Sequence, residues 1–219
     1  MATPGEFSFD TIQNFDSHIE LSIPNYVNLR ESVLRVATHF ITENALVYDL
    51  GCSTGVLLAK IRLNAPSTAR LVGIDRSDNL LGKSLSAGVT LINDDLTRED
   101  LTLDPCELCL SLFTLQFLPI DVRKRLIDTV YDALKPGGAL IVAEKQYIDD
   151  GYIQDLFTFS HYDMKLEHFT AEEILEKQLS LRRIMRPQSE EQNRQLLGRF
   201  RSVTPIWQFL QFKAWLCIK

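Results

Sequence analysis

The segment Val47-Tyr48-Asp49-Leu50-Gly51-Cys52-Ser53-Thr54-Gly55 decides the fold, because an apolar run passes through two glycines into a helical pattern. Gly51 lets the backbone approach a ligand closely, and Gly55 allows the following helix to pack tightly. Asp49, at the end of the predicted strand, can meet a ligand's ammonium group. Ser53 replaces the middle glycine of a dinucleotide fingerprint, which argues against a nicotinamide cofactor.

Two further predicted strands also end in acidic residues. Asp75 follows Gly55 by about twenty residues, the spacing expected of an acid that binds both hydroxyls of a ribose. Its alternative role is to cap a helix that begins near Ser77. The next strand ends at Asp94 and Asp95. We expect Asp95 and its neighbouring backbone to bind an adenine edge, and Asp94 to be an ordinary loop charge.

Apolar segments alternate with helical patterns on both sides of this region. The predicted strands are 45–50, 71–75, 89–92, 108–115 and 139–143, the predicted helices are 54–63, 78–84 and 121–134, and 203–219 is expected to form a closing hairpin. This alternation predicts an α/β fold with βαβ units. The expected architecture is a doubly wound, mainly parallel, seven-stranded sheet of the Rossmann-like type.

Two stretches lie outside the alternation, 1–43 and 146–201, and both are predicted to be helical. Thr170 and Glu173 have the form of a capping box at a helix start. Because open α/β sheets bind ligands at the carboxyl ends of their strands, such helices usually cover that rim. We therefore expect one domain over 1–219, with an N-terminal helical lid and a helical insertion that also serves as a lid.

Composition sets the broad class of protein. The 219 residues are 45% apolar and 24% charged, with a net charge of −6, as in an ordinary globular domain and unlike a non-specific nucleic-acid binder. The sequence lacks a long apolar run and a signal-peptide pattern, so the expected location is the cytoplasm, away from membranes. Cys106 and Cys109 are expected on opposite faces of a strand, as buried packing, and no metal site is predicted.

Three acidic strand ends behind a glycine turn resemble the class I S-adenosylmethionine-dependent methyltransferases over residues 47–145. Within them, the whole chain looks most similar to the carboxy-S-adenosyl-methionine synthase family. The matching strings are Ile23-Pro24-Asn25-Tyr26, Tyr48-Asp49-Leu50-Gly51-Cys52-Ser53, Phe113-Thr114-Leu115-Gln116-Phe117-Leu118, Pro136-Gly137-Gly138-Ala139-Leu140 and Glu144-Lys145. The resemblance implies a homodimer that carboxylates S-adenosylmethionine with prephenate, for modification of the tRNA wobble uridine.

The resemblance also implies a set of cofactor contacts. They are Tyr26, Gly51, Cys52, Ser53, Asp75, Asp95 and Leu96, to which Asp49 is added by its place at the strand end. Three positions depart from the family: Arg76 and Leu112 stand where it has asparagine, and Gln178 stands where it has an arginine that crosses the dimer interface. A shift of one residue would place Leu179 there instead. A neutral amide lacks the charge and the bidentate fork of arginine.

These departures leave three functions open. The first is methyl transfer from S-adenosylmethionine to a small-molecule or RNA acceptor. The second is synthesis of the carboxylated cofactor, with Arg182, Arg183 or Arg76 replacing the missing arginine. The third is nucleoside binding without catalysis. A DNA acceptor is disfavoured, because the fourth strand lacks the Asn/Asp-Pro-Pro-aromatic string of enzymes that methylate base amino groups.

Candidate catalytic residues are few. His161, on the predicted lid, could deprotonate an acceptor near neutral pH, although a packing or surface role is the alternative. Tyr26 is the second candidate. Glu144 and Lys145 follow the fifth strand, where either a functional role or an ion pair is expected. The arginine-rich stretch 181–201 could bind RNA or an anionic substrate, or form a solvated dimer rim.

Overall fold

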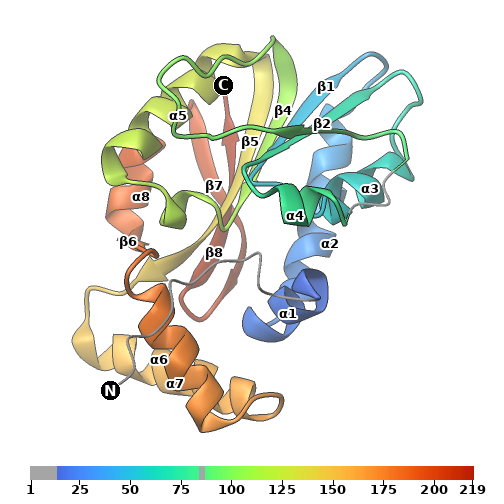
Figure 1. Ribbon diagram of the computed structural model, residues 1–219. Helices are drawn as coiled ribbons and strands as arrows, with labels where there is room; N and C mark the ends of the chain where they lie inside the picture. The colour runs from blue at the N-terminus through green and yellow to red at the C-terminus, as the bar shows by residue number, and fades with distance from the viewer. Residues whose placement is uncertain (1–13, 84–86) are drawn as a thin grey trace.

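Buried strands form the centre of the molecule, which the computed structural model describes for residues 14–83 and 87–219 (Figure 1). The strands are β1 (Leu46–Leu50), β2 (Arg70–Asp75), β3 (Thr90–Asn93), β4 (Cys106–Leu112), β5 (Leu134–Tyr147), β7 (Ser202–Phe209) and β8 (Phe212–Ile218). Their order is β3-β2-β1-β4-β5-β8-β7, with β8 antiparallel to β5 and β7 antiparallel to β8. The predicted seven-stranded, doubly wound sheet is confirmed, and the short β6 (Gln188–Ser189) adds an eighth strand beside β5.

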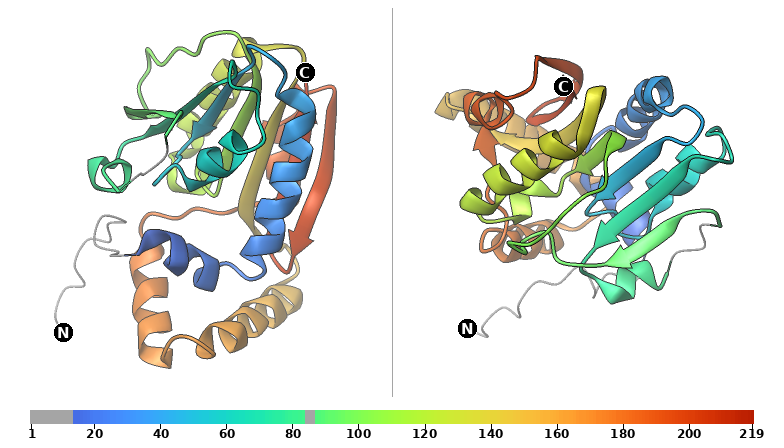
Figure 2. Two further views of the ribbon diagram at one scale, coloured as in Figure 1. Left: turned by 90° about the vertical axis from the view of Figure 1, so that its right-hand side faces the viewer. Right: turned by 90° about the horizontal axis from the view of Figure 1, so that it is seen from above.

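Helices cover both faces of the sheet (Figure 2). Helices α2 (Tyr26–Ala37) and α3 (Val56–Arg62) lie on one face, and α5 (Ile120–Ala133) and α8 (Glu190–Leu196) on the other. The short α4 (Asp78–Leu81) follows β2, and two 3-10 turns are formed by Thr38–Phe40 and Leu115–Phe117. Helices α1 (Phe15–Ser22), α6 (Gly151–Leu166) and α7 (Ala171–Leu181) lie beyond the carboxyl ends of the parallel strands (Figure 1).

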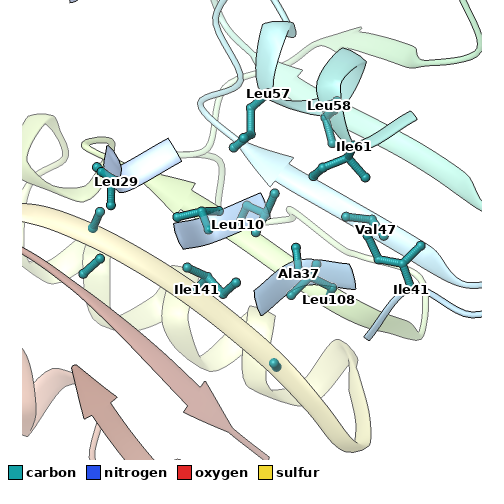
Figure 3. Close-up of a cluster of buried hydrophobic side chains, with 14 of the residues drawn as sticks. Leu29, Ala37, Ile41, Val47, Leu57, Leu58, Ile61, Leu108, Leu110 and Ile141 are labelled. Atoms are coloured by element: carbon teal, nitrogen blue, oxygen red, sulfur yellow. The ribbon is translucent and has the colours of Figure 1, made fainter. Parts of the chain in front are cut away.

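The apolar side chains of the inner strands pack into two separate cores, one on each face of the sheet. Val47 packs with α2 and α3, whereas its neighbours Leu46 and Tyr48 pack toward α5. In Figure 3, Leu110 and Ile141 of neighbouring strands face the same cluster, and both are fully buried. Each such side chain contributes about 1.5 to 3 kcal/mol when removed from water. Burial on both faces explains why these strands are nearly continuous in apolar character.

Cys106 and Cys109 lie on the same face of β4, so the prediction of opposite faces is wrong. The pairing of β4 with β5 shifts register between Cys106 and Leu108. At this irregularity the chain departs from regular alternation, and the Sγ atoms of Cys106 and Cys109 lie 3.6 Å apart on one side of the strand. Both thiols are fully buried in the core beside α5, as expected of packing residues.

Several element boundaries differ from those predicted. Strand β4 ends at Leu112, and Phe113 has a φ of 58°, so the chain leaves the sheet earlier than expected. The closing hairpin predicted for 203–219 is present as β7 and β8, with its turn at Leu210 and Gln211. The predicted end of the second helix, Ser84, lies outside the described residues. The capping box is confirmed, because Glu173 N donates to Thr170 Oγ1 and Thr170 N donates to Glu173 Oε2.

Stretches 14–43 and 146–201 are largely helical, and residues 1–13 of the predicted N-terminal lid lie outside the described part of the chain. Across the described ranges, none of the helices has both the length and the apolar character needed to cross a bilayer.

Candidate functional site

A cavity of about 830 Å³ opens at the carboxyl ends of the parallel strands, beneath α1, α6 and α7. This is the rim where open α/β sheets bind ligands. The cavity wall includes every candidate cofactor contact predicted from the sequence, namely Tyr26, Asp49, Gly51, Cys52, Ser53, Asp75, Arg76, Asp95, Leu96 and Leu112. His161 and Gln178 also line it. Residues far apart in the sequence therefore share one pocket.

The glycine turn has a left-handed backbone at three of its residues. Gly51 and Gly55 have φ values of 77° and 74°, and Ser53 between them has 55°. A Cβ atom on Gly51 would lie 2.3 Å from Thr114 Oγ1, so the side chain of Thr114 adds a second reason for glycine. Ser53 Oγ is buried and has no hydrogen-bond partner among residues 14–83 and 87–219. An orphaned hydroxyl at this turn is a polar group that a bound ligand can satisfy.

Asp75 holds the glycine turn in place. Its Oδ2 accepts a hydrogen bond of 2.8 Å from Ser53 N, and its Oδ1 accepts one of 2.9 Å from Ser77 N. Helix α4 is capped by Ser77, whose Oγ accepts from Leu80 N, rather than by Asp75. A carboxylate offers about four acceptor sites, so two remain for ribose hydroxyls.

Asp49 is a fully enclosed acid next to Asp75. Burial, followed by the charge of Asp75, raises the pKa of Asp49 to about 7. In the described part of the chain, no lysine or arginine forms an ion pair with it. A ligand carrying an ammonium or sulfonium group would supply the missing positive charge. The acid therefore fits S-adenosylmethionine at this position.

This environment predicts a pH-dependent affinity. A cationic ligand favours ionised Asp49, so binding should weaken as the pH falls below about 7, by up to about tenfold per pH unit. Calorimetric titration with S-adenosylmethionine from about pH 6 to pH 8.5 measures this slope. Asp49→Asn should bind more weakly at pH 8 and lose this part of the slope. An equal slope in both proteins would assign the titration to another group.

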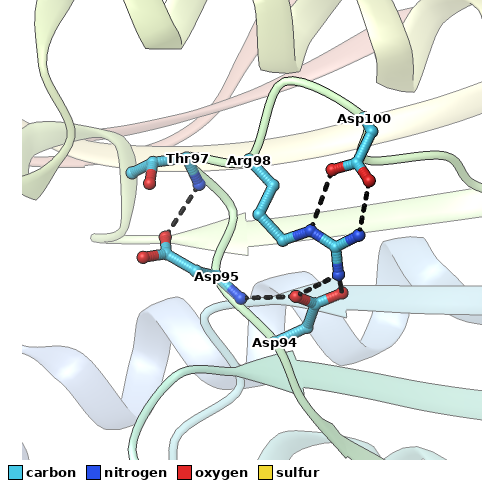
Figure 4. A network of polar contacts seen from close by, with 5 residues as sticks. All are labelled: Asp94, Asp95, Thr97, Arg98 and Asp100. Atoms are coloured by element: carbon cyan, nitrogen blue, oxygen red, sulfur yellow. Dashed lines mark hydrogen bonds and ion pairs between the residues drawn. The ribbon is translucent and has the colours of Figure 1, made fainter.

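Asp94 and Asp95 both line the cavity but have different hydrogen-bond partners (Figure 4). Asp94 accepts from Arg98 at 2.9 and 3.0 Å and from Asp95 N at 2.8 Å, while Arg98 also binds Asp100. Asp95 Oδ1 accepts a hydrogen bond of 2.8 Å from Thr97 N. Asp94 is thus occupied by an ion pair, whereas Asp95 is fixed by a single backbone donor at the cavity wall.

The two catalytic candidates are poor bases in this pocket. Burial, the charge of Lys165 and other nearby lysines lower the pKa of His161 to about 3, and its Nε2 lies 2.9 Å from the carbonyl oxygen of Ser22. His161 therefore joins α6 to the end of α1 as a neutral imidazole. Burial and the charge of Asp49 raise the pKa of Tyr26 to about 12, so its hydroxyl stays protonated at neutral pH and can donate but not remove a proton.

Helix α1 is attached at both ends. At its start, Thr54 Oγ1 of the glycine turn donates a 2.8 Å hydrogen bond to Asp16 Oδ1. At its end, the carbonyl of Ser22 contacts His161. The sequence shows neither contact, because each joins segments that are far apart along the chain.

Two buried ionisable side chains, Glu144 and Arg123, stabilise the turn that follows β4. The carboxylate of Glu144 accepts from Leu115 N and Gln116 N, both at 2.9 Å. Burial raises the pKa of Glu144 to about 8. The ion pair proposed between Glu144 and Lys145 is absent from the described contacts, since Glu144 binds backbone instead and the Lys145 ammonium lies over the Phe212 ring at 5.9 Å.

Arg123 of α5 is the second buried charge. It is 2% exposed and donates to the carbonyl oxygens of Leu118, Gln116 and Arg186, and to Gln188 Oε1. The guanidinium thus joins the turn after β4 to the segment that precedes β6. Sequence reasoning missed it, because an arginine on an amphipathic helix is normally expected at the surface.

Three lysines line the cavity wall. The sequence analysis left the role of Lys145 open and did not identify Lys165 or Lys177 as site residues. Lys145 comes from β5, Lys165 from α6 and Lys177 from α7. Burial is the first cause that lowers the pKa of each, to about 8 for Lys165 and about 7 for Lys177. The spacing of His161 and Lys165, four residues apart on one helix, was the available signal for a shared face.

Several arginines of the stretch 181–201 bind other residues of the same chain or line its cavity. Arg194 pairs with Glu190, and Arg199 binds Asp128 and Asp132 while stacking over Tyr131 at 4.1 Å. Arg183 and Arg186 line the cavity. Gln178 lines the cavity of its own chain, so α7 lies over the pocket of the chain to which it belongs.

Comparison with known proteins agrees with this geometry. Residues 47–138 match the family model described as a methyltransferase domain. The chain is 30% identical over 232 residues to carboxy-S-adenosyl-L-methionine synthase of Pasteurella multocida (strain Pm70), covering 100% of this chain and 96% of that protein. It is 32% identical over 228 residues to the synthase of Shewanella sp. (strain MR-7), covering 98% and 93%.

A solved structure with the same fold is human N-acetylserotonin methyltransferase in complex with SAM, at a TM-score of 0.58 and 18% identity, covering 87% of this chain and 51% of that one. The full-length similarity to the two synthases agrees with the resemblance inferred from the sequence strings. The chain therefore belongs to the carboxy-S-adenosyl-L-methionine synthase family, within the class I S-adenosylmethionine-dependent methyltransferase superfamily.

Proposed function

We propose that this S-adenosylmethionine-dependent transferase moves a methyl group to a small-molecule acceptor held beneath α6 and α7. The main support is that Asp49, Asp75 and Asp95, which follow or end three parallel strands, all line one cavity of about 830 Å³. A cavity of this size has room for a second substrate. Asp49 would hold the cationic part of the cofactor, Asp75 the ribose and Asp95 the adenine. When bound, the cofactor supplies an electrophilic methyl group.

The remaining work is done by positioning. Enclosure beneath three helices excludes water, and alignment of an acceptor with the methyl group supplies much of the rate enhancement of such transfers. Tyr26 can donate a hydrogen bond into this space. Mass spectrometry of purified protein and of its reaction with candidate acids and alcohols tests the proposal: a retained S-adenosylmethionine or S-adenosylhomocysteine supports it, and an empty site that no nucleoside can fill contradicts it.

Asp75 provides the sharpest test of the cofactor position. Asp75→Ala removes the acceptors for the ribose hydroxyls and releases Ser53 N, so affinity for S-adenosylmethionine should fall by about 2 kcal/mol, roughly thirtyfold. Calorimetric titration measures the change. Asp94→Ala is the matched control and should change the affinity little, because Arg98 occupies that carboxylate. Unchanged affinity in Asp75→Ala would remove this residue from the site.

Synthesis of the carboxylated cofactor is the second candidate. The full-length similarity to carboxy-S-adenosyl-L-methionine synthases favours it, as do Arg183 and Arg186 in the cavity wall. Arg182, the first substitute considered from the sequence, is not among the lining residues. Incubation with S-adenosylmethionine and prephenate, followed by mass spectrometry, separates the two candidates, because only the second consumes prephenate. A role in tRNA modification follows only if the second candidate holds.

We also propose a homodimer formed through the outer surface of α6 and α7. Tyr152 and Phe159 of α6 are 73% and 64% exposed, and Leu175 of α7 is 59% exposed. Exposed aromatic and aliphatic side chains at helical spacing are typical of an interface. A second copy is the favoured partner, because closed two-fold dimers are the commonest soluble oligomers.

Light scattering should therefore give the mass of a dimer, and Phe159→Glu combined with Leu175→Glu should give a monomer. Leu63→Glu is the matched control, since Leu63 is 81% exposed and lies at the end of α3. It should leave the dimer intact. A monomeric unaltered protein, or a dimer that survives the double substitution, contradicts this interface.

A further inference from the structure

Helix α1 brings a further carboxylate, Asp16, to the cavity wall beside the glycine turn. Its Oδ1 accepts a 2.8 Å hydrogen bond from Thr54 Oγ1, and Thr54 is itself 5% exposed. The contact joins the first turn of α1 to the residue that follows Ser53 in the glycine turn. The sequence assigned no role to Asp16, because its partner lies 38 residues further along the chain.

The charge of Asp16 has no counter-charge in the folded chain. Among residues 14–83 and 87–219, no basic side chain lies within ion-pair distance of it. Arg30 also lines the cavity, but it is paired with Glu20 of α1. Asp49 is 4% exposed and likewise forms no ion pair with the described residues. Two partly desolvated carboxylates in one cavity are unfavourable until a cation meets them.

Both carboxylates act on the same part of the cavity wall, where the Tyr26 hydroxyl lies. Burial is the first cause that raises the pKa of Tyr26 to about 12, and the charges of Asp49 and Asp16 add to that effect. The lysines of the cavity come from β5, α6 and α7 instead. A cationic group of a ligand in this region is therefore attracted by both acids.

We propose that Asp16 is a specificity-determining residue that favours S-adenosylmethionine over the product that replaces it in the cavity. S-adenosylmethionine carries one net positive charge, the sum of its sulfonium, ammonium and carboxylate groups. Methyl transfer removes the sulfonium charge, because the bonding electrons stay on sulfur, and an added carboxylate would balance that charge. Either candidate reaction therefore leaves a product without net charge, and the attraction to Asp16 is lost. The inference goes beyond the choice between the two functions.

Thr54 fixes the place where the charge acts. Its hydroxyl occupies one acceptor site of the Asp16 carboxylate, which has about four, so the others are available to donors of a ligand. A side chain that is already held loses less conformational freedom when a ligand binds. Thr54 is thus a positioning residue that acts through Asp16.

Calorimetric titration of S-adenosylmethionine and S-adenosylhomocysteine, which differ by one methyl group and its charge, tests the role of Asp16. Asp16→Asn keeps an acceptor for Thr54 and removes the charge. Affinity for S-adenosylmethionine should fall about fivefold relative to that for S-adenosylhomocysteine, which is about 1 kcal/mol. Affinity for S-adenosylhomocysteine should stay within about twofold, which also shows that the variant is folded. Asp94→Asn is the matched control and should leave the ratio unchanged, because Arg98 already neutralises this acid of the same cavity.

Two substitutions of Thr54 test the positioning. Thr54→Val removes the hydrogen bond and should lose part of the preference, whereas Thr54→Ser keeps the hydroxyl and should retain it. A preference that Thr54→Val retains in full would remove Thr54 from this role. In Asp16→Asn, equal losses for the two ligands would show that Asp16 only shapes the cavity, and an unchanged ratio would show that its charge does not reach the ligand. Either result overturns the proposal, and both are binding measurements that do not depend on which reaction follows.

Discussion

Arg123→Met should lower the free energy of unfolding by about 3 to 5 kcal/mol, the loss typical of removing one partner from a buried charged network. The methionine fills a similar volume but leaves the carbonyl oxygens of Leu118 and Arg186 without the guanidinium donor, while the Gln116 carbonyl keeps the 2.7 Å hydrogen bond from Arg186 N. Each unsatisfied buried acceptor costs about 1 to 3 kcal/mol. Glu144 also loses the positive charge that favours its ionised form.

Urea denaturation followed by circular dichroism measures the change. Lys124→Met is the matched control on the same helix, because Lys124 is exposed and its ion pair with Asp128 is worth about 1 kcal/mol at most. A loss below about 1 kcal/mol for Arg123→Met would show that water replaces the guanidinium at these carbonyls.

Gln178→Arg combined with Leu112→Asn should shift ligand preference toward carboxy-S-adenosylmethionine by about 1.5 to 3 kcal/mol. The carboxylated ligand brings one more negative charge into a partly dehydrated cavity, which is costly unless a cation or several donors meet it. Gln178 and Leu112 both line the cavity and offer fewer donors than arginine and asparagine would. Competitive calorimetry of the two ligands measures the shift.

The unaltered protein should bind S-adenosylmethionine at least as tightly as the carboxylated form. Leu112→Ile is the control, since it keeps the wall apolar and should leave the preference unchanged. If the unaltered protein prefers the carboxylated ligand, Arg183 is the first residue to substitute, because its side chain lies in the cavity wall. Arg183→Met should then reverse that preference.

Local patterns predicted the sheet and the acidic rim well. Strands β1 and β2 are recognisable because both of their faces are buried, and the acids at their ends lie where parallel strands place them. Cys106 was placed on the wrong face, since a bulge depends on pairing with β5. Arg123 was unpredictable for a similar reason: its acceptors are backbone carbonyls, which carry no sequence signal.

The lid was the least predictable part of the site. Lys165 and Lys177 belong to different helices, and only their packing across the cavity brings them to one pocket. Gln178 was located through a family resemblance, which gives a position on α7 but not the pocket that it lines. Packing between helices that are distant in the sequence determines which lysines share the pocket and which pocket Gln178 lines. A single sequence does not predict such packing.

The attachment of α1 at both ends sets a condition for turnover. Thr54 of the glycine turn binds the first turn of α1, and His161 of α6 contacts its last residue. Lys177 of α7 also contacts His18 and Ser22 of α1, so the helix cannot swing as a flap and opening this side of the cavity requires several of these hydrogen bonds to break. Each costs about 0.5 to 3 kcal/mol. Opening of this side of the cavity is therefore coupled to the glycine turn through Thr54.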